Sequence, residues 1–118
     1  MAFSDDGPAV AADEKRGAMR QRVLLSGKIV YGDLDLTMDC VIRDLSATGT
    51  RIRLSSPVIL PSTVWLIELR SGTAFQCQIA RRNVPDFGLN FIRTVKLHRN
   101  DDPELKMLRR IWTDCTVR

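Results

Sequence analysis

Short segments in which apolar and polar residues alternate fill most of residues 22–92, and residues that favour tight turns separate them. Alternation with a period of two is typical of β-strands with one buried face. The segments expected as strands are residues 23–31, 36–44, 50–54, 64–69, 75–80 and 87–92. Because no helical segment long enough for a crossover lies between them, we expect antiparallel pairing in a barrel or a curled sheet.

The residues after the last expected strand change to a helical period. Asp101-Asp102-Pro103-Glu104 supplies a capping carboxylate, a proline suited to the first helical turn and an acid near the helix N-terminus. Apolar residues then recur at helical spacing, at Leu105, Leu108, Ile111, Trp112 and Cys115. The expected fold class is all-β with a C-terminal helix, which either covers the barrel or binds a partner.

The length of 118 residues, 44% of them hydrophobic, suits one domain with a single core. Residues 1–14 contain no Lys or Arg and are expected to form a flexible acidic tail. Residues 15–96 are expected to form the β-barrel domain with a basic loop at its start. Residues 97–118 are expected to form the helix that packs on the barrel.

The charge balance favours an anionic partner. Lys and Arg number 18 against 14 Asp and Glu, for a net charge of +4. Lysine occurs only at positions 15, 28, 96 and 106, so the cationic residues are mostly arginine. A guanidinium group offers a fork for phosphate and a flat face that stacks on a base. A GC-rich genome also raises arginine content, so composition alone does not identify the ligand.

The cysteines indicate a reducing compartment and no metal site. Cys40, Cys77 and Cys115 are far apart, form no CxxC pair and are accompanied by a single histidine, His98. We expect all three thiols in or near the core. The sequence shows no signal-peptide pattern and no apolar segment of membrane-spanning length, so a cytoplasmic protein without a membrane span is expected.

Two short motifs carry most of the chemistry. Arg16-Gly-Ala-Met-Arg20 places two guanidinium groups four residues apart, and Asp44-Leu-Ser46-Ala-Thr-Gly49 places a carboxylate, a hydroxyl and a glycine in an expected surface turn. The cations suit phosphates and purine faces, and the carboxylate can accept hydrogen bonds from the guanine N1–H and N2–H groups. Taken separately, each motif is equally typical of an exposed linker or an ordinary turn.

The motif pair, in this order, resembles the RxxxR and (D/N)xSxxG motifs of the PilZ domain family of bacterial cyclic di-GMP receptors. Thr50-Arg-Ile52 is similar to the family's continuation of the second motif, and Ala80-Arg-Arg82 with a turn into Phe87-Gly-Leu89-Asn-Phe91 is similar to its closing hairpin. The resemblance covers residues 15–92. It implies a six-stranded antiparallel PilZ-type β-barrel.

The resemblance also implies a receptor that binds cyclic di-GMP, orders its basic loop on the barrel and signals to an unidentified protein partner, with motility or biofilm formation as typical outputs. The implied ligand-binding residues are Lys15, Arg16, Arg20, Asp44, Ser46 and Gly49. The arginines would grip phosphates and stack on guanine, and Asp44 would accept from guanine. Ser46 would bond to phosphate or to the turn backbone, and Gly49 would allow a positive φ and close ligand approach. Lys15 favours a stacked pair of ligand molecules.

Other classes of function are less well supported. The sequence has no Gly-rich phosphate loop before a helix and no convincing catalytic dyad, so we expect neither an enzyme nor a cofactor or metal beyond the ligand. A basic β-barrel that binds single-stranded nucleic acid needs exposed aromatic side chains. Aromatic residues make up only 6% of the chain, and Phe75, Phe87, Phe91 and Trp112 are expected to face the core. A PilZ adaptor that binds no nucleotide is a further alternative.

Overall fold

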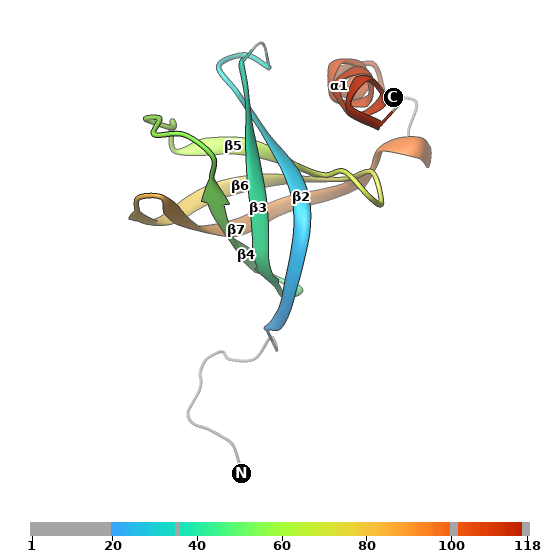
Figure 1. The fold of residues 1–118 in the computed structure, drawn as a ribbon. Helices are drawn as coiled ribbons and strands as arrows, with labels where there is room; N and C mark the ends of the chain where they lie inside the picture. The colour runs from blue at the N-terminus through green and yellow to red at the C-terminus, as the bar shows by residue number, and fades with distance from the viewer. Residues whose placement is uncertain (1–19, 35, 100–101, 117–118) are drawn as a thin grey trace.

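The computed structural model describes residues 20–34, 36–99 and 102–116 (Figure 1). The strands are β2 (Gln21–Tyr31), β3 (Leu36–Leu45), β4 (Gly49–Leu54), β5 (Thr63–Glu68), β6 (Thr73–Asn83) and β7 (Asp86–Lys96). The 3-10 turns η1 (Leu97–Arg99) and η2 (Pro103–Leu105) lead to helix α1 (Lys106–Thr116). Six antiparallel strands followed by a C-terminal helix confirm the expected fold class at this level. The expected acidic tail at 1–14 and the start of the basic loop lie outside the described residues.

The strands form one sheet that closes on itself. Their order is β2-β3-β4-β7-β6-β5, and β5 pairs back to β2, where Gly27 lies opposite Glu68. Strands β4 and β7 are distant in sequence, yet they pair with Gly49 opposite Asn90. Strands β6 and β7 extend beyond their expected ends and form a long hairpin.

The inner face of the sheet holds the main hydrophobic core. In β4 the inward side chains Thr50, Ile52 and Leu54 are buried, while Arg51 and Arg53 are exposed, as the alternation predicts. Phe75 and the partly buried Phe91 stack within this core, with ring centroids 4.2 Å apart. The core is completed by Ile29, Cys40, Ile42, Leu60, Val64, Leu66, Cys77, Phe87 and Leu89.

Helix α1 covers part of the outer face and creates a second core there (Figure 1). The Asp102 side chain caps η2 by accepting from the backbone N–H of Glu104 at 3.0 Å. The expected apolar stripe faces the sheet, with Leu105 and Leu108 fully buried. Trp112 is partly buried, and its indole N–H donates to the Leu69 carbonyl at 2.8 Å. Within the described residues, no helix is both long and apolar enough to span a membrane.

Gly72 fixes how the helix approaches the sheet. It has φ +70°, and a Cβ there would overlap the Trp112 ring. We expect Gly72→Ala to lower the free energy of unfolding by roughly 1–3 kcal/mol, because it adds backbone strain and displaces the indole. Urea unfolding and Trp fluorescence would measure both effects. Gly88→Ala is the control, since its Cβ would make only ordinary contact with Arg81. Equal stability of the two variants would contradict this account.

The cysteines lie where the sequence analysis expects them. Cys40 and Cys77 are buried and Cys115 is partly exposed. Desolvation raises the pKa of both Cys40 and Cys77 to about 12, with the charge of Asp39 adding to the effect at Cys40. The described residues contain no cluster of His, Cys, Asp and Glu side chains that could hold a metal ion.

We therefore expect a thiol reagent at about pH 8 to modify only Cys115 quickly in the folded protein, because the other two thiols stay protonated and covered. Cys115→Ser should abolish the fast reaction. Stability should fall as the pH rises above about 9, because unfolded thiols ionise there while the folded ones retain their protons. Equal reaction rates of all three thiols before unfolding would refute the assignment.

Candidate functional site

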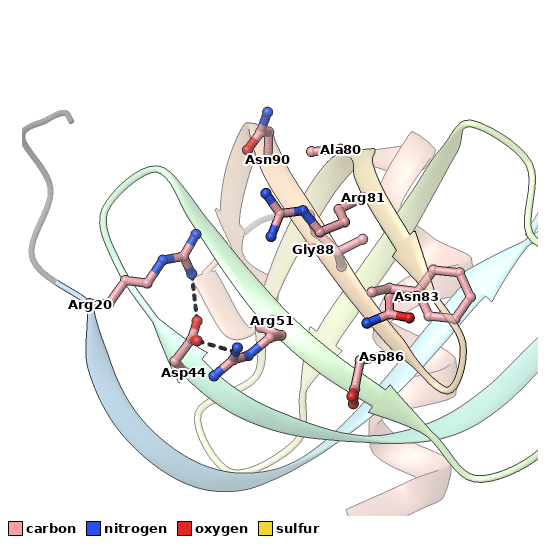
Figure 2. A pocket seen from close by; sticks show the side chains of 11 residues that line it. Arg20, Asp44, Arg51, Ala80, Arg81, Asn83, Asp86, Gly88 and Asn90 are labelled. Carbon is pink, nitrogen blue, oxygen red and sulfur yellow. Dashed lines mark hydrogen bonds and ion pairs between the residues drawn. The ribbon is translucent and has the colours of Figure 1, made fainter. Parts of the chain in front are cut away.

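A pocket of about 550 Å³ lies on the outer face of the sheet (Figure 2). The elements that line it are the residue before β2, the end of β3, β4, and the hairpin of β6 and β7. The lining residues are Arg20, Asp44, Arg51, Ala80, Arg81, Asn83, Asp86, Phe87, Gly88, Leu89 and Asn90. Because these residues come from five segments, only the folded sheet assembles the pocket.

Strand register explains the shape of the pocket. Gly88 of β7 lies opposite Arg51 of β4 on one side and opposite Arg81 of β6 on the other. Residues that pair across strands share a face of the sheet, so two guanidinium side chains flank a position without a side chain. Across this row the pocket is deepest at Gly88, which has no side chain, and it is bordered by the guanidinium groups of Arg51 and Arg81. Asn90 and Asn83 add amide groups that can donate and accept hydrogen bonds.

Asp44 lies between two arginines within this pocket (Figure 2). Its Oδ1 is 2.6 Å from Nη1 of Arg20, and its Oδ2 is 3.2 Å from Nε of Arg51. The Asp44 side chain is only 6% exposed, whereas those of Arg20 and Arg51 are 56% and 58% exposed. The carboxylate is therefore shielded and paired, while both guanidinium groups keep surface that faces solvent.

Asp44 lies in β3, as the strand expected at residues 36–44 predicts, but it is buried, so the expectation that it lies in a surface turn is wrong. A register shift between Ile42 and Asp44 explains its direction. Ile42 pairs with the inward Ile52, and Asp44 pairs with the outward Arg51, so one additional residue lies in β3 at this point. A β-bulge of this kind re-aims the side chains that follow it. Here it directs the carboxylate towards the pocket.

Asp86 is a second acid at the pocket, and it is neutralised by a neighbour. Arg53 donates two hydrogen bonds to its carboxylate, at 2.9 and 3.2 Å. These bonds hold the pKa of Asp86 below its usual value, and the charges of Arg53, Arg43 and Arg51 add to the effect. Asp86 is paired to Arg53, which does not line the pocket, so the three lining arginines, Arg20, Arg51 and Arg81, outweigh the charge of the lining acids Asp44 and Asp86. The pocket consequently favours an anion.

Ser46 and Gly49 form the turn beside the pocket and do not line it. The Ser46 hydroxyl accepts from the backbone N–H groups of Thr48 and Gly49, at 3.2 and 3.1 Å. Of the two roles expected for Ser46, a bond to phosphate or a bond to the turn backbone, the structure shows the second. Gly49 does not have the positive φ that we expected. A glycine is needed there because a Cβ would overlap the Leu89 carbonyl oxygen of β7.

The structure thus brings together Arg20 and Asp44 from the expected site, with Ser46 and Gly49 in the adjoining turn. Lys15 and Arg16 lie outside the described residues. The sequence analysis did not assign the other nine lining residues to the site, namely Arg51, Ala80, Arg81, Asn83, Asp86, Phe87, Gly88, Leu89 and Asn90. All but Asn83 and Asp86 stand within the strings that resemble the PilZ family, but their meeting depends on strand register, which the sequence does not specify.

The sequence matches no protein-family model and no curated protein. An assignment of function therefore rests on the motif residues and on the geometry of the pocket.

Asp44→Ala should remove the ion pairs that link β3 to Arg20, before β2, and to Arg51 of β4. We expect a loss of about 1–2 kcal/mol in the free energy of unfolding, because two charge-assisted contacts disappear while both arginines remain solvated. Asp39→Ala is the control, since Asp39 pairs with Lys28 but its side chain is 71% exposed. That variant should lose less than about 1 kcal/mol. Urea denaturation reports both values, and a larger loss for Asp39→Ala would contradict the assigned role of Asp44.

Proposed function

We propose that this protein is a cytoplasmic PilZ-type β-barrel receptor that binds cyclic di-GMP in the pocket beside Asp44 and signals to a protein partner. The observation that carries the proposal is the contact between the two motifs. Arg20 of the RxxxR motif and Asp44 of the second motif are 24 residues apart in sequence, and their side chains are joined at 2.6 Å. Two motifs that together suit a guanine nucleotide thus supply groups to one anion-favouring pocket.

The groups in the pocket match the chemistry of the ligand. Cyclic di-GMP carries two phosphates and two guanines, which call for cations and for a carboxylate opposite the guanine N1–H and N2–H edge. Arg20, Arg51 and Arg81 supply the cations, and Asp44 supplies the carboxylate. Gly88 leaves room between the arginines for a flat base. The pocket volume lies within the range of small-molecule sites.

The ion pairs of the ligand-free protein suggest how binding alters its conformation. Both oxygens of Asp44 are engaged by arginines and the side chain is only 6% exposed, so we expect guanine to reach the carboxylate by displacing one of these arginines. Arg20 is the partner expected to move, because it precedes β2, whereas Arg51 lies within β4. Transfer of Arg20 from Asp44 to a phosphate would reposition the chain at the start of β2. We propose that this movement is the signal that the partner detects.

Calorimetry with cyclic di-GMP tests the assignment directly. Arg20→Ala and Arg81→Ala should each lower affinity about ten- to a hundredfold, because each removes a charge-assisted contact of roughly 1.5–3 kcal/mol. Arg16→Ala should act similarly if the whole RxxxR motif contributes. Arg110→Ala on α1 is the control and should bind as the wild type does. The fitted stoichiometry would also show whether one molecule or a stacked pair binds.

The same titrations with GMP and with a single-stranded oligonucleotide separate the alternatives. A receptor for cyclic di-GMP should show at most weak affinity for either probe. Tight binding of the oligonucleotide with no response to cyclic di-GMP would replace the proposal with nucleic-acid binding. If the folded wild-type protein bound none of these probes, the remaining interpretation would be a PilZ adaptor that binds no nucleotide.

A further inference from the structure

Two loops form a second surface at one end of the closed sheet, on the side away from α1 (Figure 1). They are residues 55–62, between β4 and β5, and the β6–β7 turn at residues 83–86. The backbone N–H of Leu54 donates to the Pro85 carbonyl at 3.0 Å, and that of Ile79 donates to the Ser62 carbonyl at 2.8 Å. Both ends of the first loop are therefore fixed to the β6–β7 hairpin. We call these two loops the loop-tip surface.

The loop-tip surface exposes apolar side chains that the fold does not use. Leu60 is 2% exposed and anchors the first loop in the core, while the adjacent Ile59 is 93% exposed. Val84, at the turn of the hairpin, is 61% exposed. Exposed prolines extend the apolar area at Pro57, Pro61 and Pro85. Backbone hydrogen bonds join the two loops, so these exposed apolar side chains lie at the same end of the sheet and indicate a contact surface.

Cationic side chains border these apolar tips. Arg82 directly precedes the β6–β7 turn, and Arg53 directly precedes Leu54 at the end of β4; both are exposed. Residues 55–62 contain no charged side chain, and the one acid in residues 83–86 is Asp86, which is paired with Arg53. The surface thus combines protruding aliphatic groups with a net positive border.

We propose that the loop-tip surface docks on an anionic lipid membrane, with Ile59 and Val84 entering the headgroup region and Arg82 close to lipid phosphates. Aliphatic side chains that protrude from loops suit a fluid surface, which can close around them, whereas a folded protein partner must present matched hollows. Positive charge beside shallow apolar insertion is the combination that holds proteins reversibly on acidic bilayers. Asn83 and Asp86 of the β6–β7 turn also line the pocket, but the side chains proposed to contact lipid, Ile59, Val84 and Arg82, do not, so the proposal does not depend on nucleotide binding.

Co-sedimentation of the full chain with vesicles tests this docking. The protein should sediment with phosphatidylcholine vesicles that contain about one third phosphatidylserine and remain in solution with pure phosphatidylcholine, because the acidic lipid supplies the attraction. Ile59→Asp and Val84→Asp should each lower the partition coefficient about tenfold or more, since each replaces an inserting side chain with an anion. Arg82→Glu should also weaken binding, and the effect should diminish as salt is added.

Matched variants on α1 keep the test specific. Met107→Asp changes a side chain that is 45% exposed, and Arg110→Glu reverses an exposed charge; both should sediment as the wild type does. Circular dichroism should show every variant folded, because all the changed side chains are on the surface. The proposal would be overturned if the wild-type protein did not sediment with the acidic vesicles. It would also be overturned if the loop variants and the helix variants lost vesicle binding to the same extent. Binding of a polyglutamate peptide in place of vesicles would instead assign the surface to an acidic protein segment.

Discussion

The pairing of β4 with β7 is the constraint on which the rest of the structure depends. It joins segments that are distant in the chain, and it places Gly49 opposite Asn90 and Arg51 opposite Gly88. Without this pairing the meander of β2, β3 and β4 would not meet the hairpin of β6 and β7, and the sheet would not close. The same ladder builds the pocket, because its central row passes from β4 through β7 to β6. The same strand pairing therefore closes the sheet and brings the residues of the pocket together.

The pairing also limits which residues the second motif can contain. The backbone of β7 passes so close to Gly49 that a side chain there would overlap the Leu89 carbonyl. Ser46 uses its hydroxyl to hold the backbone of the same turn. Asp44 is the member of the motif whose side chain reaches the pocket. Two of the three motif residues thus support the geometry of the third.

The strands and the helix could be predicted because each has a local period. Alternation located β4 closely, and the capping sequence around Asp102 located the start of the helical region. The bulge at Ile42 and Asp44 could not be predicted, since a single added residue leaves the apolar pattern nearly unchanged while it reverses the direction of a side chain. For a related reason, the sequence does not identify Arg51, Gly88 and Arg81 as parts of one site. Their alignment is set by register across three strands, a property of the whole sheet.

Closure of the described sheet has a further consequence for how another protein could recognise this one. Every strand from β2 to β7 has a hydrogen-bonded neighbour on both sides. The second neighbour covers only part of the longer strands, because β5 pairs with residues 27–30 of β2 and β4 pairs with residues 86–90 of β7. Backbone to which a partner could add a strand is therefore confined to short segments, and no strand has a whole side open. Recognition is expected to use mainly side chains and loops, which a bound ligand or a few substitutions can alter without disturbing the hydrogen bonds between strands.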